Sequence, residues 1–224
     1  TTINLSSLDG SNGFRVDGAG GPVSNAGDVN GDGFDDFIVD GSGASYVVFG
    51  KALGFDAAIS LSSLDGNNGF RLDGAAPYDE SGSSVSSAGD VNGDGFDDLI
   101  IGAPNAASNG NNSSGTGSSY VVFGQASGFE AAMDLASLDG KNGFRLDGVV
   151  GSDAFGASVS GAGDVNGDGF DDLIVGAPQA DPNGYSSGSS YIIFGRSDFS
   201  YPDVTHPGTP GNDNLIGTSA ADIF

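Results

Sequence analysis

Cysteine and tryptophan are absent from this 224-residue sequence, which also holds only one histidine and six basic residues. Without cysteine the chain can form neither disulfides nor thiolate metal sites, so its stability must come from packing and from any bound ion. A single histidine leaves few groups that could act as a general base near pH 7. The sequence shows no Ser/His/Asp or Cys/His set and no glycine-rich nucleotide loop, and it predicts a protein that is not an enzyme.

The shortage of basic residues restricts the partners of the chain. Thirty acidic residues against six basic ones give a formal net charge of −24, a field that repels a phosphate backbone and predicts no nucleic-acid partner. No run of about 18 apolar residues occurs, which predicts no membrane span. The chain starts Thr1-Thr2, without Met or a signal-like segment, and we expect it to be a piece of something longer.

Glycine, in contrast, is abundant at 41 residues, and the sequence consists of three copies of the same blocks. The first block reads Ser-Leu-Asp-Gly-x-Asn-Gly-Phe-Arg-(Val/Leu)-Asp-Gly, at 7–18, 63–74 and 137–148. The second reads Ala-Gly-Asp-Val-Asn-Gly-Asp-Gly-Phe-Asp-Asp followed by apolar residues, at 26–39, 88–101 and 162–175. The third reads Ser-Tyr-(Val/Ile)-(Val/Ile)-Phe-Gly, at 45–50, 119–124 and 190–195.

Each copy contains about four short segments of strand composition, flanked by turn residues. In the second copy they are 69–73, 83–88, 98–103 and 119–123. Continuous apolar runs such as 120–123 indicate strands that are buried on both faces. Four-stranded sheets packed face to face in a circular array bury strands in this way, so the sequence predicts an all-β fold of antiparallel β-propeller blades.

The predicted propeller region spans residues 1–195, with repeats at about 1–50, 51–124 and 125–195; residues 196–207 are a predicted linker and 208–224 a separate tail segment. The repeats start out of phase with the blades. Residues 65–73 are expected to form the outer strand of the first blade, and 139–147 that of the second. No such block follows Phe194, whereas residues 3–17 are a surplus copy. Two interpretations stay open: a partial propeller with further repeats upstream, or a six-bladed ring in which two chains exchange residues 3–17 as a homodimer.

The nine-residue segment Asp-Val-Asn-Gly-Asp-Gly-Phe-Asp-Asp predicts a calcium loop. Calcium takes six to eight hard oxygen ligands, and acidic or amide side chains at alternate positions can point inward to supply them. Positions 1, 3, 5 and 9 would bind through side chains and position 7 through its backbone carbonyl, while the acidic residue at position 8 should point away. The predicted ligands are Asp28, Asn30, Asp32, Phe34 and Asp36, then Asp90, Asn92, Asp94, Phe96 and Asp98, then Asp164, Asn166, Asp168, Phe170 and Asp172. We therefore expect about three calcium ions per chain.

Two other structures could account for the same loop sequence. An EF-hand needs Glu at position 12 followed by a helix, but Val39, Ile101 and Val175 stand there within apolar strands. The side chains could instead make only Asx turns in a hairpin. Three copies with three converging carboxylates each would repel themselves without a cation, which favours metal binding. In the first block, Arg15, Arg71 and Arg145 each precede an Asp by two residues, which predicts an ion pair on one strand face.

The Asp-x-Asn-x-Asp-Gly-x-x-Asp loop, Phe-Gly at 49–50, 123–124 and 194–195, and Gly-Ala-Pro at 102–104 and 176–178 together resemble the FG-GAP repeat. This repeat forms the blades of the integrin α-subunit β-propeller and of many bacterial surface proteins, and the resemblance implies calcium binding by the loop residues given above. Two departures stand out. The first copy has Asp40-Gly41-Ser42 in place of Gly-Ala-Pro, and family propellers have seven blades whereas this chain has three repeats.

The tail from Gly208 to Phe224 is similar to the RTX nonapeptide Gly-Gly-x-Gly-x-Asp-x-U-x, with Gly211, Asp213 and Leu215 in phase. One and a half repeats are too few to bind calcium, so we expect the start of an RTX-type region. The resemblance implies a bacterial protein that is secreted. The sequence thus predicts a calcium-binding, non-enzymatic module of a secreted or cell-surface protein, acting in adhesion to a protein or glycan ligand or as a spacer. The alternative is a carbohydrate-binding lectin module that uses loops 105–118 and 179–189.

Overall fold

The computed structural model describes residues 2–41, 43–107, 115–126 and 128–199, and the predicted RTX-like tail at 208–224 lies outside them. Within the described residues the protein is nearly all β and has no α-helix, as the sequence predicts. Three 3₁₀ turns occur at equivalent places in the repeats: η1 (Leu5–Ser7), η2 (Leu61–Ser63) and η3 (Leu135–Ser137). No helix in this part of the chain has the length and apolar character needed to cross a membrane.

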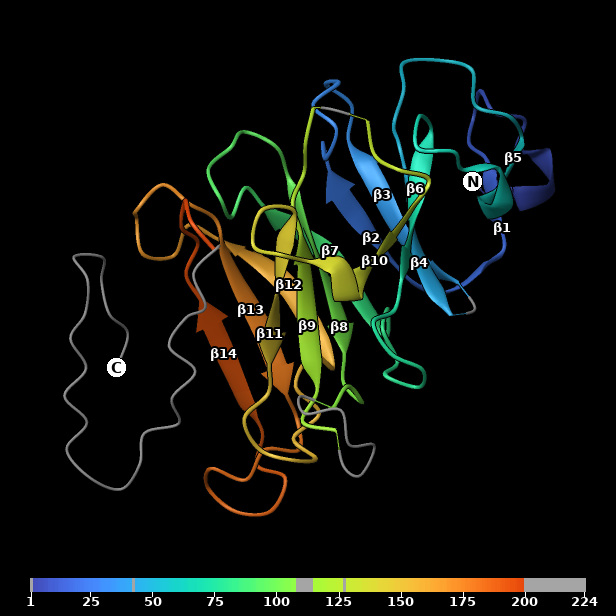
Figure 1. Cartoon of the computed structure of the whole chain (residues 1–224). Helices are drawn as coiled ribbons and strands as arrows, with labels where there is room; N and C mark the ends of the chain where they lie inside the picture. The colour runs from blue at the N-terminus through green and yellow to red at the C-terminus, as the bar shows by residue number, and fades with distance from the viewer. Residues whose placement is uncertain (1, 42, 108–114, 127, 200–224) are drawn as a thin grey trace.

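Three antiparallel sheets lie side by side in an arc, and each corresponds to one propeller blade (Figure 1). The first blade consists of β2 (Ala19–Gly27), β3 (Asp36–Gly41), β4 (Ala44–Val48) and β6 (Gly69–Asp73). The second consists of β7 (Ser84–Gly89), β8 (Asp98–Ala103), β9 (Ser118–Val122) and β11 (Gly143–Asp147). The third consists of β12 (Ser158–Gly163), β13 (Asp172–Ala177) and β14 (Ser189–Ile193).

The outer strand of each complete blade comes from the first block of the following repeat, as predicted. β6 pairs with β4 so that Arg71 lies opposite Tyr46, and β11 pairs with β9 so that Arg145 lies opposite Tyr120. In the described residues the third blade has no fourth strand. The surplus strand β1 (Arg15–Asp17) instead pairs in parallel with β5 (Ala58–Ser60).

The parallel pairing was not predicted, and it occurs twice. β10 (Ala132–Asp134) lies beside β6 in the same way as β5 lies beside β1. These strands have three residues each and carry no run of β-branched or aromatic side chains, so their sequences give no strand signal. Each one leads directly into a 3₁₀ turn, and its position is set by the outer strand that it adds to.

The hydrophobic core lies between neighbouring blades. Every residue of β8 is buried, and so is every residue of β9, in agreement with their continuous apolar sequences. One cluster joins Ile38 and Val47 of the first blade to Leu99 and Ile101 of the second. A second cluster joins Ile100 and Val121 to Leu173 and Val175 of the third blade. The strands of the middle blade therefore use one face for each neighbour.

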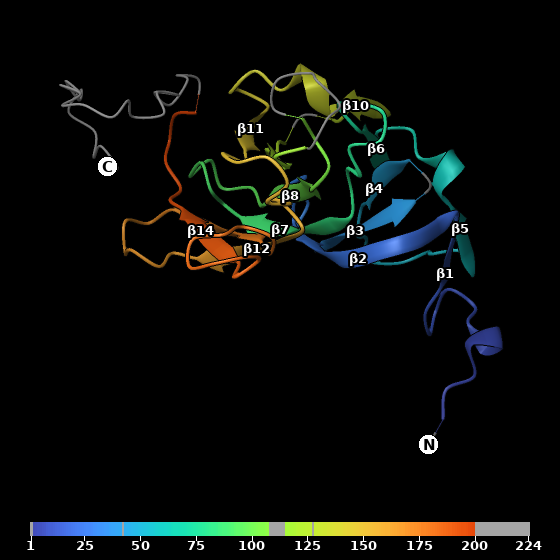
Figure 2. The same ribbon diagram turned by 90° about the horizontal axis from the view of Figure 1, so that it is seen from below.

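Within the arc, the first strands β2, β7 and β12 pack against one another. Seen from below, they occupy one side of the arc and the outer strands β6 and β11 the other (Figure 2). Stacked phenylalanine rings recur on the outer side. Phe70 stacks on Phe129 with ring centroids 4.2 Å apart, and Phe144 stacks on Phe199 at 4.0 Å. Each blade contact thus repeats the same arrangement of strands and rings.

Candidate metal centres

The predicted calcium loops connect the first and second strands of each blade, β2 to β3, β7 to β8 and β12 to β13. Glycine at positions 4 and 6 turns the backbone sharply in each loop. In the first loop Gly31 and Gly33 have φ values of 71° and 88°, a region that glycine occupies without steric cost. Position 12 of each loop lies inside a strand, so the structure agrees with the exclusion of an EF-hand.

The side chains at positions 1, 3 and 5 fold back over the loop backbone. In the first loop Asp28 accepts hydrogen bonds from the N–H groups of Asp32 at 3.0 Å and Gly33 at 2.8 Å. The Asp32 carboxylate accepts from the Phe34 N–H at 3.0 Å, and the Asn30 amide donates to Asp32 at 3.2 Å. The other two loops repeat this pattern. The oxygen-bearing side chains are thus held on one short turn of backbone.

The aspartate at position 9 ties the loop to the Phe-Gly motif of the same blade. Both oxygens of the buried Asp36 accept backbone hydrogen bonds, from Val29 N–H at 3.0 Å and from Gly50 N–H at 2.8 Å. Asp98 and Asp172 bind the corresponding groups at 2.8–2.9 Å. This contact explains why the loop and the Phe-Gly dipeptide recur together, since one carboxylate joins them.

The carboxyl groups at the two ends of the loop have pKa values shifted in opposite directions. Burial raises the pKa of Asp36 to about 7 and that of Asp98 to about 8, because a desolvated carboxylate favours its neutral form. Two backbone N–H groups oppose this rise in each case, and the charges at positions 5 and 1 add to it. At position 1 of the third loop, the N–H groups of Gly169, Gly167 and Asp168 hold the pKa of Asp164 below its usual value. The three carboxylates of a loop are therefore close enough to affect one another.

A divalent cation such as calcium needs several hard oxygen ligands that converge on one point. Within the described ranges, no three His, Cys, Asp or Glu side chains gather closely enough to form a ready-made metal centre. The side chains make Asx-type turns instead, which was the competing interpretation of the loop. The donor types nevertheless fit a hard cation, because each loop offers carboxylate, amide and carbonyl oxygens and no nitrogen or sulfur ligand. Each Asp28 oxygen accepts one hydrogen bond and so keeps a second lone pair. Oδ1 of Asp90 and Oδ1 of Asp164 each accept two backbone N–H groups, and only their Oδ2 atoms keep a lone pair.

The acidic residue at position 8, which the sequence predicts to point away from its own loop, has a role that the sequence did not reveal. Asp97 accepts a hydrogen bond from the Asp28 N–H at 2.8 Å, and Asp171 accepts from the Asp90 N–H at 3.0 Å. Each therefore caps the loop of the preceding blade. The recurrence of this aspartate in all three copies was the sequence signal that it has a role. The sequence did not identify its partner, which lies 69 or 81 residues away.

The phenylalanine at position 7 also reaches the preceding loop. A Cβ built on Gly93 would lie 2.5 Å from Cε1 of Phe170, and Gly31 lies against Phe96 in the same way. The glycine at position 4 is therefore required twice, for its positive φ and for the ring that covers it. Among the described residues no equivalent loop lies before that of Phe34, which is 41% exposed.

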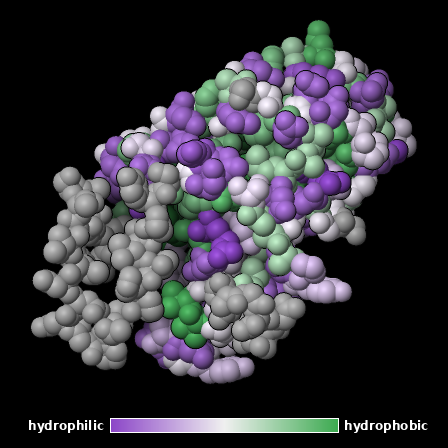
Figure 3. Space-filling model, viewed as in Figure 1, coloured by the Kyte–Doolittle hydropathy of each residue, from purple (hydrophilic) through white to green (hydrophobic). Residues whose placement is uncertain are grey.

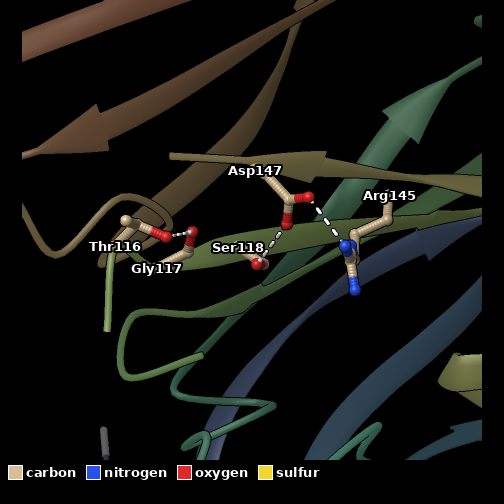
Figure 4. Close-up of polar contacts among 5 residues, drawn as sticks. All are labelled: Thr116, Gly117, Ser118, Arg145 and Asp147. Atoms are coloured by element: carbon tan, nitrogen blue, oxygen red, sulfur yellow. Dashed lines mark hydrogen bonds and ion pairs between the residues drawn. The ribbon is translucent and has the colours of Figure 1, made fainter. Parts of the chain in front are cut away.

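The predicted arginine–aspartate ion pairs are present in all three outer-strand blocks. Arg145 contacts Asp147 at 2.7 Å, and the other Asp147 oxygen accepts a hydrogen bond from Ser118 of the neighbouring strand at 2.8 Å (Figure 4). The equivalent ion pairs Arg15–Asp17 and Arg71–Asp73 have contacts of 2.6 and 2.8 Å. All three pairs are solvent-exposed, so they contribute little stability. The face seen in Figure 3 mixes hydrophilic and hydrophobic residues.

Comparison with known proteins agrees with this geometry. The FG-GAP repeat profile matches residues 81–122 and 155–193, which span the second and third of the predicted loops. Integrin alpha-PS5 of Drosophila melanogaster is 33% identical over 164 residues, covering 69% of this chain and 14% of the integrin. Integrin alpha-V of Gallus gallus is 31% identical over 173 residues, 76% of this chain and 15% of the integrin. Phosphatidylinositol-glycan-specific phospholipase D of Bos taurus is 30% identical over 183 residues, 77% of this chain and 20% of that enzyme.

These matches concern a limited part of each relative, since the chain spans about a seventh of the integrins and a fifth of the phospholipase. The chain therefore carries FG-GAP repeats on propeller-type blades and is similar in sequence to integrin α chains.

Proposed function

We propose that this chain is a calcium-stabilised, non-enzymatic β-propeller module of a secreted or cell-surface bacterial protein. The three identical loops carry the proposal, because they repeat one set of hard oxygen donors at one place in every blade. Calcium would be held by the side chains at positions 1, 3, 5 and 9 and the carbonyl at position 7. It would supply positive charge to each group of carboxylates, in a chain whose net charge is −24.

The position-9 aspartate supports this proposal most directly. Asp36 and Asp98 are buried, and the neighbouring loop carboxylates raise their pKa values further. A bound cation would offset that repulsion and favour the ionised form of the buried group. The loops join blades through Asp97 and Asp171, so a cation in one loop would also stabilise a contact between blades.

The similarity to integrin α chains supports adhesion or protein interaction as the function. In the second form of the proposal the module binds no ligand and acts as a structural spacer. Two of the relatives are named as integrins, and the adhesive role is proposed for this chain because of its similarity to them. One relative is named as a phospholipase, but the chain covers only a fifth of it. The exposed arginine–aspartate pairs are engaged with each other, and we assign no chemistry to them.

Calorimetric titration of chelator-treated protein with CaCl₂ tests the metal part of the proposal. We expect uptake of three ions per chain, and absence of any calcium uptake would refute it. Beads coated with the chain test adhesion on fixed cell layers, with and without a chelator. Attachment that trypsin treatment of the cells abolishes indicates a protein ligand, whereas attachment lost on periodate oxidation indicates a glycan and the lectin alternative. No attachment to any surface would leave the spacer role.

A further inference from the structure

A cavity lies at the junction between the first and second blades. Its volume is about 610 Å³, within the range of roughly 300–1,000 Å³ that small-molecule sites have. Asp40 and Gly43 beside the β3–β4 turn form one wall, and the crossover 74–83, which joins β6 to β7, forms the other. The lining residues lie in or between the two blades whose four strands are present, so both walls of the cavity are complete.

The equivalent place at the next junction is filled by an aromatic side chain. Ser81 corresponds to Phe155, since each follows a buried aspartate by two residues and precedes a glycine. Phe155 is 6% exposed, and its ring lies edge-on to the ring of Tyr191 with centroids 5.5 Å apart. A serine in this place leaves the space of the ring unfilled.

The hairpin beside the crossover is also shorter at the first junction. Residues 104–117 join β8 to β9, and the Thr116 carbonyl accepts a hydrogen bond from the Phe155 N–H at 3.2 Å. Only residues 42–43 join β3 to β4. Two departures from the repeat, a small side chain and a short hairpin, therefore open the cavity at this junction.

Carboxylates supply hydrogen-bond acceptors along the lining. Asp79 is 5% exposed, and its two oxygens accept backbone N–H groups of its own crossover at 2.9 and 3.0 Å. Asp40 stands where the second blade has Gly102; it is half-buried and accepts from the Ser45 hydroxyl at 3.1 Å. Glu80 lies at the exposed rim. Among the described residues that line the cavity none is basic, which disfavours an anionic ligand.

Two further groups of the lining are available to a ligand. The Ser81 hydroxyl oxygen is buried and has no hydrogen-bond partner in the described part of the chain. A buried hydroxyl without a partner is unfavourable, so a ligand that pairs with it gains affinity. Tyr78 is 92% exposed and has a φ of 67°, close to the 69° of its counterpart Ser152. The crossover thus presents the Tyr78 ring to solvent beside the cavity.

We propose that this cavity binds a neutral sugar unit of a glycan. Sugar hydroxyls would donate to Asp40 and Glu80 and accept from Ser81, and the Tyr78 ring would cover an apolar face of the sugar. An ammonium or guanidinium group has no acceptor and would leave the Ser81 hydroxyl proton unpaired. A sugar acid would be repelled by the carboxylates. A neutral sugar is therefore the ligand class that pairs with every available group.

This inference rests on the adhesive form of the proposed function and gives its ligand a chemical class and a place. The lectin interpretation of the sequence assigned binding to loops 105–118 and 179–189 on their composition. The cavity lies elsewhere, and it combines polar groups with apolar walls from Ala75, Ala76 and Pro77, as small-molecule sites do.

Saturation-transfer NMR of the whole chain in CaCl₂ tests the site. The probes are the methyl glycosides of glucose, galactose, mannose, N-acetylglucosamine and N-acetylgalactosamine, at about 10 mM, which populates complexes with millimolar Kd. Methyl glucuronide and arginine amide are the acidic and basic comparison probes. We expect a signal from at least one neutral glycoside and none from the glucuronide. No signal from any neutral glycoside overturns the proposal, and a signal from arginine amide alone would assign the cavity to basic side chains instead.

Three variants locate the binding. Ser81→Phe restores the residue of the equivalent place, should fill the cavity and should abolish the glycoside signal. Ser152→Phe, at an exposed serine in the crossover 148–157, is the matched control and should leave the signal unchanged. Tyr78→Ser reproduces the residue at 152 and should weaken binding about tenfold. Thermal melts in CaCl₂ check that each variant is folded, and a glycoside signal that survives Ser81→Phe overturns the proposal.

The same variants separate this inference from the proposed function. Beads coated with the Ser81→Phe variant should lose periodate-sensitive attachment to cells and keep their calcium uptake. A chain that binds no glycoside but attaches in a trypsin-sensitive way would overturn the sugar site and leave the adhesive module standing. Glycoside binding without calcium uptake would support the sugar site and refute only the metal part of the proposed function.

Discussion

Asp97 of the second loop accepts a 2.8 Å hydrogen bond from the backbone N–H of Asp28, the first residue of the loop in the preceding blade. Asp171 has the same relationship to Asp90. The three loops therefore form a connected row along the blades. This connection links the local chemistry of one loop to the packing of the next, and it makes the position-8 carboxylate a testable structural residue.

Asp97→Ala should lower the free energy of unfolding by about 1–3 kcal/mol, because it leaves the Asp28 N–H without its partner. The matched control is Asp35→Ala at the same position of the first loop, since within the described residues the first blade is the first of the arc. Urea titrations of both variants at low protein concentration measure the difference. Equal stability of the two variants would show that the inter-loop hydrogen bond makes no net contribution to the free energy of unfolding.

Removal of calcium should destabilise the fold. At a free calcium concentration about 100-fold above Kd, each occupied loop contributes about 2.7 kcal/mol to the folded state, provided that the unfolded chain does not bind. Thermal melts with CaCl₂ and with a chelator measure this effect, and MgCl₂ at the same ionic strength serves as the control. A melting temperature that does not change on chelation would contradict the prediction.

Asp94→Ala and Asp168→Ala should each remove one calcium ion and leave the other two. Each loop supplies all of its proposed ligands from nine consecutive residues, so the sites are local. Calorimetric titration gives the number of ions, and Asp56→Ala, an exposed residue outside the loops, is the control. If one substitution removed all three ions, the loops would have to be coupled more strongly than their hydrogen bonds suggest.

Asp40→Asn should stabilise the protein at pH 7 and change the pH dependence. Burial raises the pKa of Asp40 to about 6, with hydrogen bonds from Ser45 and Gly41 opposing the rise. The folded state therefore holds the proton more tightly, and this group lowers stability progressively as the pH rises from about 4 to about 6. Because Asp40 is only half-buried, we expect the variant to gain about 1 kcal/mol at pH 7. The gain should vanish at pH 4, and a gain that is independent of pH would refute the assignment.

Gly93→Ala should cost more stability than Gly167→Ala in dilute protein. The two glycines have φ values of 76° and 78°, so an alanine would strain the backbone equally at both positions. A Cβ at 93 would lie 2.5 Å from the Phe170 ring, whereas a Cβ at 167 would have no atom within 4 Å beyond the adjacent residues of the chain. The added clash should cost about 1–3 kcal/mol. Denaturant titration of both variants provides the measurement, and equal losses would argue against the contact.

Local patterns in the sequence predicted most of the blade structure. The strands at 69–73 and 98–103 and the ion pairs of Arg15, Arg71 and Arg145 follow from composition and from the two-residue period of a strand. The assignment of 65–73 to the first blade followed from counting blocks. These features depend on residues close in sequence or on the internal repetition, and both are visible without a structure.

The contacts between blades could not be predicted in the same way. The partner of Asp97 lies 69 residues earlier, and no property of the loop itself indicates it. The parallel strands at 58–60 and 132–134 depend on a neighbour for their conformation. The metal ligands stay a prediction, because the loop side chains bind backbone N–H groups in this structure and reveal no more than the types of donor.

The exchange of outer strands has a mechanical consequence. β6 belongs to the sheet of the first blade, but the chain continues from it directly into the second blade. The blades are therefore not independent units joined by a linker. A force that pulls the two ends of the chain apart cannot part the first two blades without also detaching β6 from β4 along a five-residue ladder. The same holds for β11 and β9 at the next boundary. Tension would therefore be resisted by several backbone hydrogen bonds of the ladder loaded together.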